Sequence, residues 1–373
     1  MTRRAVAVLL GGPSAEHDVS LVSGRAIAEA LTARGHTVEG WLIDLDARWW
    51  RLPDSAMDRS RAARDYDDPA ALGAEGPVGA GTALEGLAER HPRPVVFIAL
   101  HGPYGEDGTV QALCEAAGLT YTGAGVAASA VGMDKALFKR LVGALGLPVL
   151  PWISIGAAEF AGHRAAAISR LETFAAGLPD PRLIIKPNSL GSSVGVSIVH
   201  QPDEPPELEY AVAEAFRFDD TIIAEAYLAG ARELEAGVLG NATADLEVHG
   251  PGEIFPGHEF YDYTAKYQAG LSRTTGRAEL EPEVRDRIRA LASEAFLAIG
   301  AQGFARVDFL MGDAHLYISE INTIPGFTPI SLFPVVCADG GYDFGALAER
   351  IVELAVSRRS HRPSGRLTRA DLP

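Results

Sequence analysis

The stretch ARVDFLMGDAHLYISEINTIPGFTPIS, residues 305–331, is where the local structure of this chain can be argued most directly from its sequence. It predicts two β-strands, over residues 305–310 and 315–322, followed by a Pro-Gly turn. Side chains two positions apart lie on the same face of a strand. A hairpin of these strands would therefore gather the polar side chains of both on one face, if its register allows.

Four polar side chains follow the two predicted strands. Arg306 and Asp308 share a face of the first strand, and Glu320 and Asn322 share a face of the second. Carboxylate and amide oxygens are hard ligands that suit Mg²⁺ better than Zn²⁺. A magnesium site beside an arginine is suited to binding the phosphates of ATP. A half-exposed hairpin with solvated charges is the alternative that these residues alone leave open.

The register of the hairpin decides between the two interpretations. A two-residue turn at Gly312-Asp313 would place Asp308 and Glu320 on opposite faces. An odd-length turn that includes Ala314 would place all four polar groups on one face. The metal interpretation therefore requires an odd-length turn or a β-bulge.

The composition limits the classes of protein that need to be considered. A chain of 373 residues is long enough for two or three domains, and 47% hydrophobic residues is ordinary for a globular protein. A net charge of −16 argues against nucleic acid as a partner. The two cysteines, Cys114 and Cys337, lack metal-ligand spacing and fit a reducing compartment. With neither a signal peptide nor an apolar run near the ~20 residues of a membrane span, we expect a cytoplasmic protein without membrane contact.

Alternating strands and helices with a few hairpins predict an α/β or mixed α+β enzyme. The predicted strands outside the hairpin cover residues 4–10, 94–100, 182–186, 196–199, 221–226 and 232–239, and residues 120–125 predict a strand and a turn. One helix is predicted to begin near residue 20, and the other predicted helices cover residues 111–117, 134–143, 206–216, 282–299 and 342–357. Residues 54–89 have poor periodicity and predict mostly surface loop, and residues 358–373 predict a flexible tail.

Residues 188–195, NSLGSSVG, form a loop of small residues between two predicted strands. Small residues let backbone N–H groups approach phosphate oxygens closely. The loop is not a Walker A motif, because no Lys-Ser/Thr pair follows a GxxxxG. Lys186 directly before the loop favours a phosphate-binding role, and Lys135 would be a second phosphate contact. A mobile hairpin beside solvated lysines is the alternative.

Eight motifs occur in a specific order along the chain. They are GGPSAEHDVS at 11–20, HGPYGEDG at 101–108, MDK at 133–135, KPNSLGSSVG at 186–195, YDYTAKY at 261–267, RVD at 306–308, EIN at 320–322 and PGFTPISL at 325–332. In this order they closely resemble the D-alanine–D-alanine ligase family of the ATP-grasp superfamily. The resemblance extends over roughly residues 4–355, and the ordered set is more specific than any single motif.

The resemblance implies a three-domain ATP-grasp fold with ATP bound between the second and third domains. The implied domains are a Rossmann-like N-terminal domain over residues 1–130, a central domain over 131–228 and a C-terminal catalytic domain over 229–357. It also implies an enzyme that joins two D-alanines through a D-alanyl phosphate and releases ADP and phosphate. The product would serve peptidoglycan precursor synthesis, and the family is commonly dimeric, so a homodimer is expected.

The resemblance also implies which residues bind the amino acids. Glu16 would hold the ammonium of the first D-alanine, in a hydrogen-bonded triad with Ser192 and Tyr267. The residues that would contact the substrate carboxylates are His101, Ser331 and Leu332. Tyr267 would anchor a lid over residues 261–270, and a tyrosine there favours D-alanine over D-lactate as the second substrate. Thr264 departs from the family, which often has glutamate at this position.

The nucleotide, metal and oxyanion sites follow from the same resemblance. The residues implied for ATP are Lys135, Lys186, Ser192, Ser193, Glu225, Glu233 and Lys266. Asp308, Glu320 and Asn322 would bind two Mg²⁺ ions, which Mn²⁺ could replace, with Glu320 bridging them. Arg306 and the N–H of Gly326 would stabilise the developing oxyanion.

Three other functions remain to be compared with this one. Another ATP-grasp carboxylate–amine ligase, for instance a specialised or inhibitor-resistant one, would share the same motifs. A non-catalytic nucleotide-binding protein would not need the residues of a two-metal site. An NAD enzyme is disfavoured because the glycines after the first strand do not complete a GxGxxG fingerprint.

Overall fold

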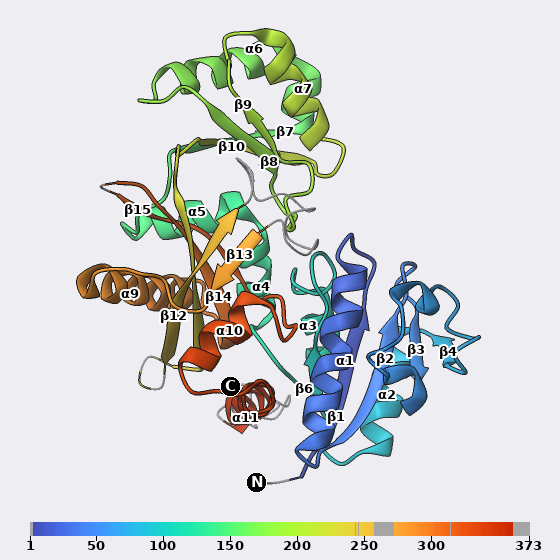
Figure 1. The fold of residues 1–373 in the computed structure, drawn as a ribbon. Coiled ribbons are helices and arrows are strands. Elements are labelled where there is room, and N and C mark those ends of the chain that lie inside the picture. The colour runs from blue at the N-terminus through green and yellow to red at the C-terminus, as the bar shows by residue number, and fades with distance from the viewer. Residues whose placement is uncertain (1–2, 243, 245, 257–271, 314, 361–373) are drawn as a thin grey trace, which may run out of the picture.

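The computed structural model describes residues 3–242, 244, 246–256, 272–313 and 315–360. Within these residues it contains three β-sheets with flanking helices, and the sheets follow one another along the chain (Figure 1). This mixture of parallel and antiparallel strands with helices confirms the predicted α/β (α+β) class. No helix in the described ranges has the length and hydropathy that a membrane span requires.

The N-terminal sheet has six strands in the order β4-β3-β2-β1-β5-β6. The strands are β1 (Ala5–Gly11), β2 (Thr37–Ile43), β3 (Trp49–Leu52), β4 (Glu75–Val78), β5 (Val95–Ile98) and β6 (Thr120–Tyr121). The helices are α1 (His17–Ala33), α2 (Ala80–Arg90) and α3 (Thr109–Ala116), with 3₁₀ helices η1 (Asp54–Met57) and η2 (Ala63–Asp67). Strand β1 pairs in parallel with β2 and β5, and β5 with β6, which forms the Rossmann-like part. The loops after β1 and β5 therefore leave the same edge, where parallel sheets bind ligands.

Residues 54–89 contain more regular structure than the sequence predicted. Helix α2 forms there, and its Ala83, Leu84 and Leu87 are buried in the N-terminal core. Two glycines, Gly81 and Gly86, lower the helix propensity of the segment. The prediction of surface loop was wrong for residues 80–89, because burial of one apolar face stabilises this helix despite its low propensity.

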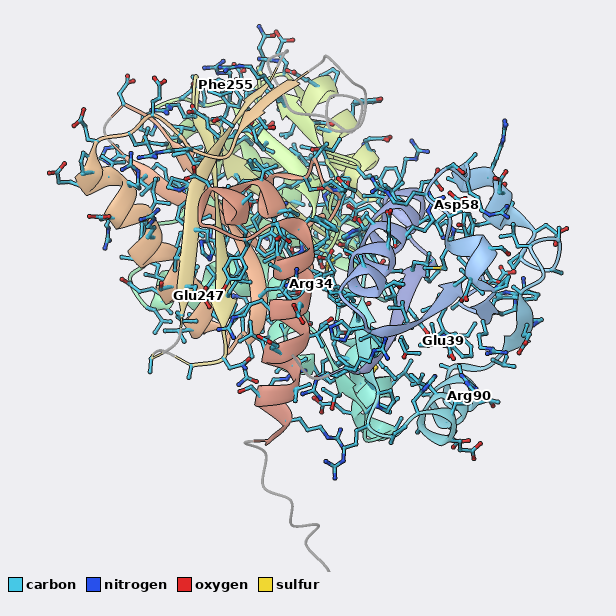
Figure 2. The ribbon with its side chains drawn as sticks, turned by 60° about the horizontal axis from the view of Figure 1, so that its bottom comes forward. Arg34, Glu39, Asp58, Arg90, Glu247 and Phe255 are labelled. Atoms are coloured by element: carbon cyan, nitrogen blue, oxygen red, sulfur yellow. The ribbon has the colours of Figure 1, made fainter. Side chains whose placement is uncertain are left out.

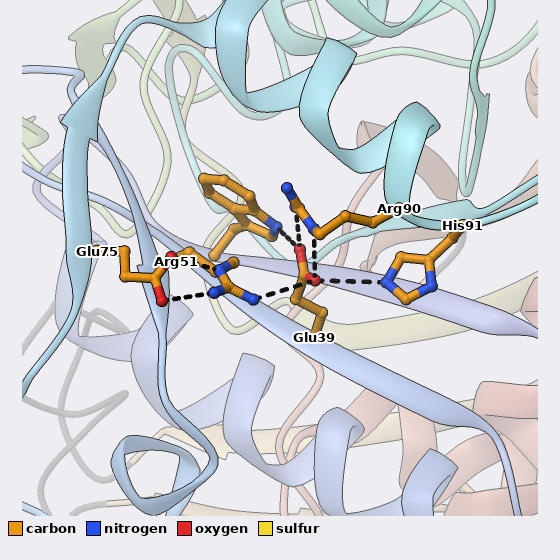
Figure 3. A network of polar contacts seen from close by, with 6 residues as sticks. Glu39, Arg51, Glu75, Arg90 and His91 are labelled. Carbon is orange, nitrogen blue, oxygen red and sulfur yellow. Dashed lines mark hydrogen bonds and ion pairs between the residues drawn. The ribbon is translucent and has the colours of Figure 1, made fainter.

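A network of charged side chains connects α2 and β4 to strands β2 and β3 of this sheet (Figure 3). Glu39 on β2 accepts a hydrogen bond from Arg90 at the end of α2, with Nη2 2.7 Å from Oε1, and lies 3.4 Å from Nε2 of His91. Arg51 on β3 donates to Glu75 on β4 at 2.5 Å. These contacts hold β4 to β3 and the end of α2 to β2.

The central sheet is antiparallel, with the strand order β7-β10-β8-β9. Its strands are β7 (Trp152–Gly156), β8 (Leu183–Pro187), β9 (Ser197–Val199) and β10 (Thr221–Ala226). Helices α6 (Ala157–Ala176) and α7 (Pro205–Ala215) cover one face of it, at the top of Figure 1. Ile155, Leu171, Ile185, Leu208 and Ile222 share the core between sheet and helices.

The C-terminal sheet has five strands in the order β13-β12-β11-β14-β15. They are β11 (Arg232–Gly240), β12 (Glu247–Pro256), β13 (Ser272–Thr275), β14 (Gly303–Met311) and β15 (Leu316–Asn322). Three helices belong to the same part of the chain. Helix α9 (Pro282–Ala298) lies between β13 and β14 in sequence, and α10 (Leu332–Asp339) and α11 (Phe344–Ser360) come after β15. Helix α10 packs closely on β11, since a Cβ at Gly237 would lie 3.1 Å from the Phe333 ring.

Two helices between the first and second sheets pack against the third. They are α4 (Val126–Met133) and α5 (Lys135–Ala144). Phe138 and Val142 of α5 share a core with Ile318 and Ile321 of β15. The start of α5, with Lys135, is therefore held beside the C-terminal hairpin.

Helix α11 returns from the C-terminal sheet to the N-terminal one. Its Leu347, Ile351 and Val352 are buried in the same core as Val6 and Phe97. The helix continues to Ser360, and Arg358 is only 6% exposed. Residues 358–360 are thus helical rather than a flexible tail, because the Arg358 guanidinium has partners across the interface; residues 361–373 lie outside the described part.

Candidate active site

A β-bulge sets the register of the β14–β15 hairpin. Asp308 lies opposite Glu320, but its neighbour Phe309 lies opposite Ile318. Ser319 is therefore one extra residue in β15. Because residues directly opposite each other share a face, the bulge brings the two carboxylates to the same face of the sheet.

The turn itself has an even number of residues. Met311 pairs with Leu316, and residues 312–315 connect them. A regular hairpin with this turn would place Asp308 opposite Ser319 and turn Glu320 to the apolar face. Of the two possibilities that the metal interpretation allowed, an odd-length turn or a β-bulge, the structure contains the bulge.

Arg306 is held between two carboxylates on this face. Its Nε and Nη2 each donate to Asp308 at 2.6 Å, and its Nε lies 3.1 Å from Oε2 of Glu235. Asn322 also donates to Asp308, at 3.0 Å. Burial by itself would lower the pKa of Arg306. The charges of Asp308 and Glu235 outweigh burial and raise this pKa well above its ordinary value. The guanidinium is thus a fixed positive charge.

Glu235 is a site residue that sequence reasoning missed. It is buried on β11 directly opposite Asp308, so Glu235, Asp308 and Glu320 form a row across three neighbouring strands. The signal was present, because Glu233 and Glu235 alternate in RELEAGVL and share a face. Glu233, which the resemblance assigned to ATP, lies on the same face of β11.

The hairpin offers oxygen donors that fit a magnesium ion bound together with phosphates. Asp308, Glu320 and Asn322 present two carboxylates and an amide on one face. In the part of the chain that the structure describes, no three His, Cys, Asp or Glu side chains converge on a metal position. Mg²⁺ commonly takes one or two carboxylates and completes its shell with phosphate oxygens and water. The residues therefore fit an ion that binds with a nucleotide rather than in a cage of protein ligands.

Three lysines and Glu225 lie next to this face, and one of the lysines contacts its Glu320. Lys186 on β8 forms an ion pair with Glu225 on β10, and Lys139 on α5 lies 2.5 Å from the other oxygen of Glu225. Lys135 Nζ lies 3.2 Å from Oε2 of Glu320. Burial by itself would raise the pKa of Glu225. The charges of Lys139 and Lys186 outweigh burial and lower this pKa to about 2. Lys139 was not selected from the sequence, because a lysine inside a helix is usually solvated.

The small-residue loop after β8 is bound to the start of α5. The Asn188 side chain accepts from Ala136 N at 2.8 Å, and its backbone oxygen accepts from Lys135 N at 3.1 Å. Lys135 Nζ donates to Leu190 O at 2.7 Å. These bonds hold the loop beside the lysines, so it is not a free hairpin.

The same loop reaches the N-terminal sheet through Ser192. Its hydroxyl donates to Oε1 of Glu16 at 2.5 Å. A Cβ at Gly102 or Gly191 would lie 2.9 or 3.1 Å from Oε2 of Glu16, so glycine at both positions leaves room for the carboxylate. The structure thus brings together two members of the predicted triad; the third, Tyr267, lies outside the described residues.

Two side chains of the loop after β5 form hydrogen bonds with one residue of the loop after β15, Ile324. Its N–H donates to Glu106 at 3.1 Å, and its carbonyl accepts from Nδ1 of His101 at 3.1 Å. The other nitrogen of His101 faces Ser23 Oγ at 3.1 Å. Burial lowers the pKa of His101, so the ring is neutral with its proton on Nδ1. In this arrangement both nitrogens are used within the protein, and His101 orients the Ile324 loop.

Glu106 is a second residue that sequence reasoning missed. It also accepts from Gly102 N at 2.9 Å, and burial together with the charge of Glu16 raises its pKa to about 8. It stands in the quoted HGPYGEDG motif, where a charge among glycines was the available signal. A narrow crevice joins it to the other parts of the site, with a lining of Glu106, Lys135, Leu190, Gly191, Glu320 and Asn322.

The remaining predicted residues lie after β15, in the loop after β8 or outside the described part. Ser331 accepts from Thr328 N at 3.0 Å, and a Cβ at Gly326 would lie 3.3 Å from the Ser331 hydroxyl. The predicted oxyanion donor and the predicted carboxylate contact are therefore neighbours, with buried Leu332 at the start of α10. Ser193 belongs to the loop after β8. Predictions for Thr264, Lys266 and the 261–270 lid fall on residues that the structure does not describe.

Comparisons with known proteins agree over nearly the whole chain. The family model "D-ala D-ala ligase N-terminus" matches residues 5–124, and "D-ala D-ala ligase C-terminus" matches residues 141–353. The curated D-alanine–D-alanine ligase of Heliobacterium modesticaldum is 39% identical over 362 residues, 96% of either chain. That of Chlorobaculum tepidum is 36% identical over 96% of this chain and 99% of its own.

Solved structures show the same similarity in three dimensions. The D-alanine–D-alanine ligase from Coxiella burnetii superposes with a TM-score of 0.79 at 31% identity, covering 97% of this chain and 96% of its own. The VanG D-Ala:D-Ser ligase from Enterococcus faecalis has a TM-score of 0.79 at 30% identity, covering 95% of this chain and all of its own.

Proposed function

Because this chain belongs to the D-alanine–D-alanine ligase family, we propose that it joins two D-alanines into D-alanyl-D-alanine in an ATP-dependent reaction. ADP and phosphate are released, and the dipeptide enters peptidoglycan precursor synthesis. The fold is the ATP-grasp fold of that family. The observation that carries the proposal is the convergence of loops from all three sheets on one crevice. Its lining includes Glu106, Lys135, Gly191 and the polar face of the β14–β15 hairpin, and Glu16 lies next to Gly191.

In the first step the carboxylate of one D-alanine attacks the γ-phosphorus of ATP, and ADP leaves. We assign the ammonium of this D-alanine to Glu16, with Ser192 fixing the carboxylate that binds it. Lys135 and Lys186 are assigned to the ATP phosphates, and Glu225 and Glu233 to the adenosine part. Ser193 and Lys266 complete the proposed nucleotide contacts.

Magnesium is the proposed metal, with manganese as a substitute. Two ions are proposed, and Asp308, Glu320 and Asn322 would hold them, with Glu320 as a ligand of both. A divalent cation bound there would neutralise negative charge on the phosphate oxygens. The support is the donor set, which is made of oxygen atoms on one face.

In the second step the amine of the other D-alanine attacks the carbonyl carbon of D-alanyl phosphate, and phosphate leaves. We assign its carboxylate to Ser331 and Leu332. Arg306 and the N–H of Gly326 are proposed to stabilise the tetrahedral oxyanion. Water must be excluded while the acyl phosphate exists, which is the proposed task of the lid with Tyr267. His101 is proposed to act near the first substrate through the loop that it orients.

The domain boundaries at residues 130 and 228, the homodimer and the cytoplasmic location are also proposals. ATP and D-alanine are metabolites of the cytoplasm, which supports that location. Light scattering on the purified protein tests the dimer, since a monomeric mass would contradict it.

A substrate screen tests the proposed reaction. ADP release is followed with D-alanine, D-serine and D-lactate, each alone and paired with D-alanine, and products are identified by mass. We expect Mg²⁺-dependent ADP release with D-alanine alone and a product of the mass of D-alanyl-D-alanine. The similarity to a D-Ala:D-Ser ligase makes D-serine the second candidate. ADP release only with D-serine or another acid present would overturn D-alanine as the second substrate.

A further inference from the structure

Lysine is rare in this chain, and the three lysines among the described residues lie close together beside the proposed nucleotide site. Of 33 basic residues, 29 are arginine and four are lysine. Three of these lysines, Lys135, Lys186 and Lys266, were assigned to ATP above. The fourth, Lys139, has no assigned role. A chain that uses arginine almost everywhere else keeps lysine at this position, which indicates a requirement for a compact ammonium group.

Lys139 is fully enclosed and has one ionic partner among the described residues. Its side chain has 0% exposure, and its Nζ lies 2.5 Å from Oε1 of Glu225. Oε2 of Glu225 faces Lys186 Nζ. One buried carboxylate is therefore shared by two lysines, one from α5 and one from β8. An arginine would bring a larger planar group into this enclosed space.

The shared carboxylate leaves the cluster with an excess of positive charge. Burial lowers the pKa of Lys139, and the charge of Glu225 works against this lowering. With all five groups ionised, Lys135, Lys139 and Lys186 carry three positive charges against the two negative charges of Glu225 and Glu320. Unbalanced charge is unfavourable in a largely buried site unless a partner arrives. Burial by itself would lower the pKa of Lys186. The charges of Glu225 and Glu320 outweigh burial and raise this pKa, so Lys186 keeps its charge. A phosphate oxygen is a suitable counter-charge for it.

We propose that Lys139 is a positioning residue of the nucleotide site, which acts through Glu225 on Lys186. Without Lys139, Glu225 and Lys186 would form a closed and neutral pair. With Lys139 present, Glu225 divides its charge between two ammonium groups, and Lys186 remains available to the phosphates of a nucleotide. The inference rests on the nucleotide site of the proposed function, but not on the identity of the amino acid substrate.

The first test compares Lys139→Met with Arg140→Met. Methionine has a similar length without charge, and Arg140 is the exposed basic neighbour on the same helix. We expect the KM for ATP to rise about 10-fold or more in Lys139→Met, with much smaller changes in kcat at saturating ATP and in the KM for D-alanine. Arg140→Met should behave like the wild type. An unchanged KM for ATP in Lys139→Met would overturn the proposal.

The second test separates positioning from a purely structural role. Glu225→Gln removes the charge through which Lys139 acts, so Lys139→Met should weaken ATP binding little further in that background. Equal losses in both backgrounds would contradict action through Glu225. The double variant also avoids a half-paired buried carboxylate, so it keeps the test possible if Lys139→Met alone does not fold.

Binding of ATP without D-alanine keeps this inference distinguishable from the proposed reaction. Equilibrium dialysis with ATP and Mg²⁺ measures it directly. Weaker ATP binding by Lys139→Met, in a protein that does not release ADP with D-alanine, would support the inference and contradict the reaction. Equal ATP binding by Lys139→Met and the wild type, with normal ligase activity in the wild type, would contradict the inference and support the reaction.

Discussion

Arg306 is positioned by its neighbours more firmly than a surface arginine could be. Two parallel bonds to Asp308 fix the plane of the guanidinium, and Glu235 binds it from the adjacent strand. A fixed cation stabilises developing charge well because it does not need to reorganise during the reaction. If Arg306 were removed, Asp308 and Glu235 would lose the positive charge that now lies between them.

Arg306→Ala should lower kcat by about 10²–10³-fold, the scale for loss of one oxyanion donor. ADP release at saturating ATP and D-alanine measures this. Arg350→Ala is the control, because Arg350 binds Glu247 in a similar way between α11 and β12. A kcat near the wild-type value in Arg306→Ala would refute the assigned role.

Glu106 should make the stability of the protein depend on pH. Its pKa is about 8 in the folded protein, against an ordinary value of 4.5. Between these values the folded protein holds a proton that the unfolded chain releases, so the free energy of unfolding falls as pH rises from about 4.5 to about 8. Urea unfolding at pH 5 and pH 8 should show a smaller fall for Glu106→Gln than for the wild type. Identical pH dependence of the two proteins would show that Glu106 does not titrate in this range.

At the scale of single residues the site was predictable in part. Asp308, Glu320 and Asn322 were found because their residue types and their spacing along strands are informative by themselves. Glu106, Lys139 and Glu235 were missed because their importance lies in their surroundings. The sequence does not distinguish a glutamate with a raised pKa, or a buried lysine, from other residues of the same type, because the residues that bury them are far away in the chain.

At the scale of elements, one residue decides whether the hairpin can form the site. Ile318 and Ile321 of β15 are both buried, although they are three positions apart. Strict alternation would bury one of them and expose the other. The bulge at Ser319 resolves this conflict, and it turns Glu320 and Asn322 to the polar face.

Insertion of one alanine between Ser319 and Glu320 should abolish the site. Glu320 and Asn322 would be shifted by one position toward the apolar face, and we expect turnover to fall by at least about 10²-fold. Insertion of one glycine after Asp313 is the matched control, since it lengthens the turn and leaves the paired strands in register. Equal effects of the two insertions on ADP release would contradict the importance of the bulge.

At the scale of the whole molecule, helix α11 ties the two ends of the chain together. Arg358 donates to the carbonyls of Gly123 and Tyr121, the latter at 2.7 Å, and its guanidinium lies 4.3 Å from the Tyr121 ring. At the other end of the helix Arg34, labelled in Figure 2, binds Glu349 at 2.5 Å. The N-terminal sheet, which supplies Glu16 and Glu106, is thereby held at a defined position against the C-terminal sheet.

Arg358→Ala should lower the free energy of unfolding by about 2–4 kcal/mol, because it leaves two carbonyls without their charged donor in the interface. Arg359→Ala is the control, since the neighbouring side chain is exposed, and its effect should stay within about 0.5 kcal/mol. Urea unfolding of both variants measures the difference. Similar stabilities would show that Arg358 does not hold the interface.

The sequence by itself determined the elements and the chemistry of their side chains. Strand alternation and the small residues of the loop at 188–195 depend on residues close together in the chain, which local backbone geometry constrains directly. Only the tertiary structure decided which face Glu320 takes, that His101 is neutral, and that Lys139 shares Glu225 with Lys186. Strand register, burial and charge pairing depend on contacts between segments far apart in sequence, and no local pattern specifies them.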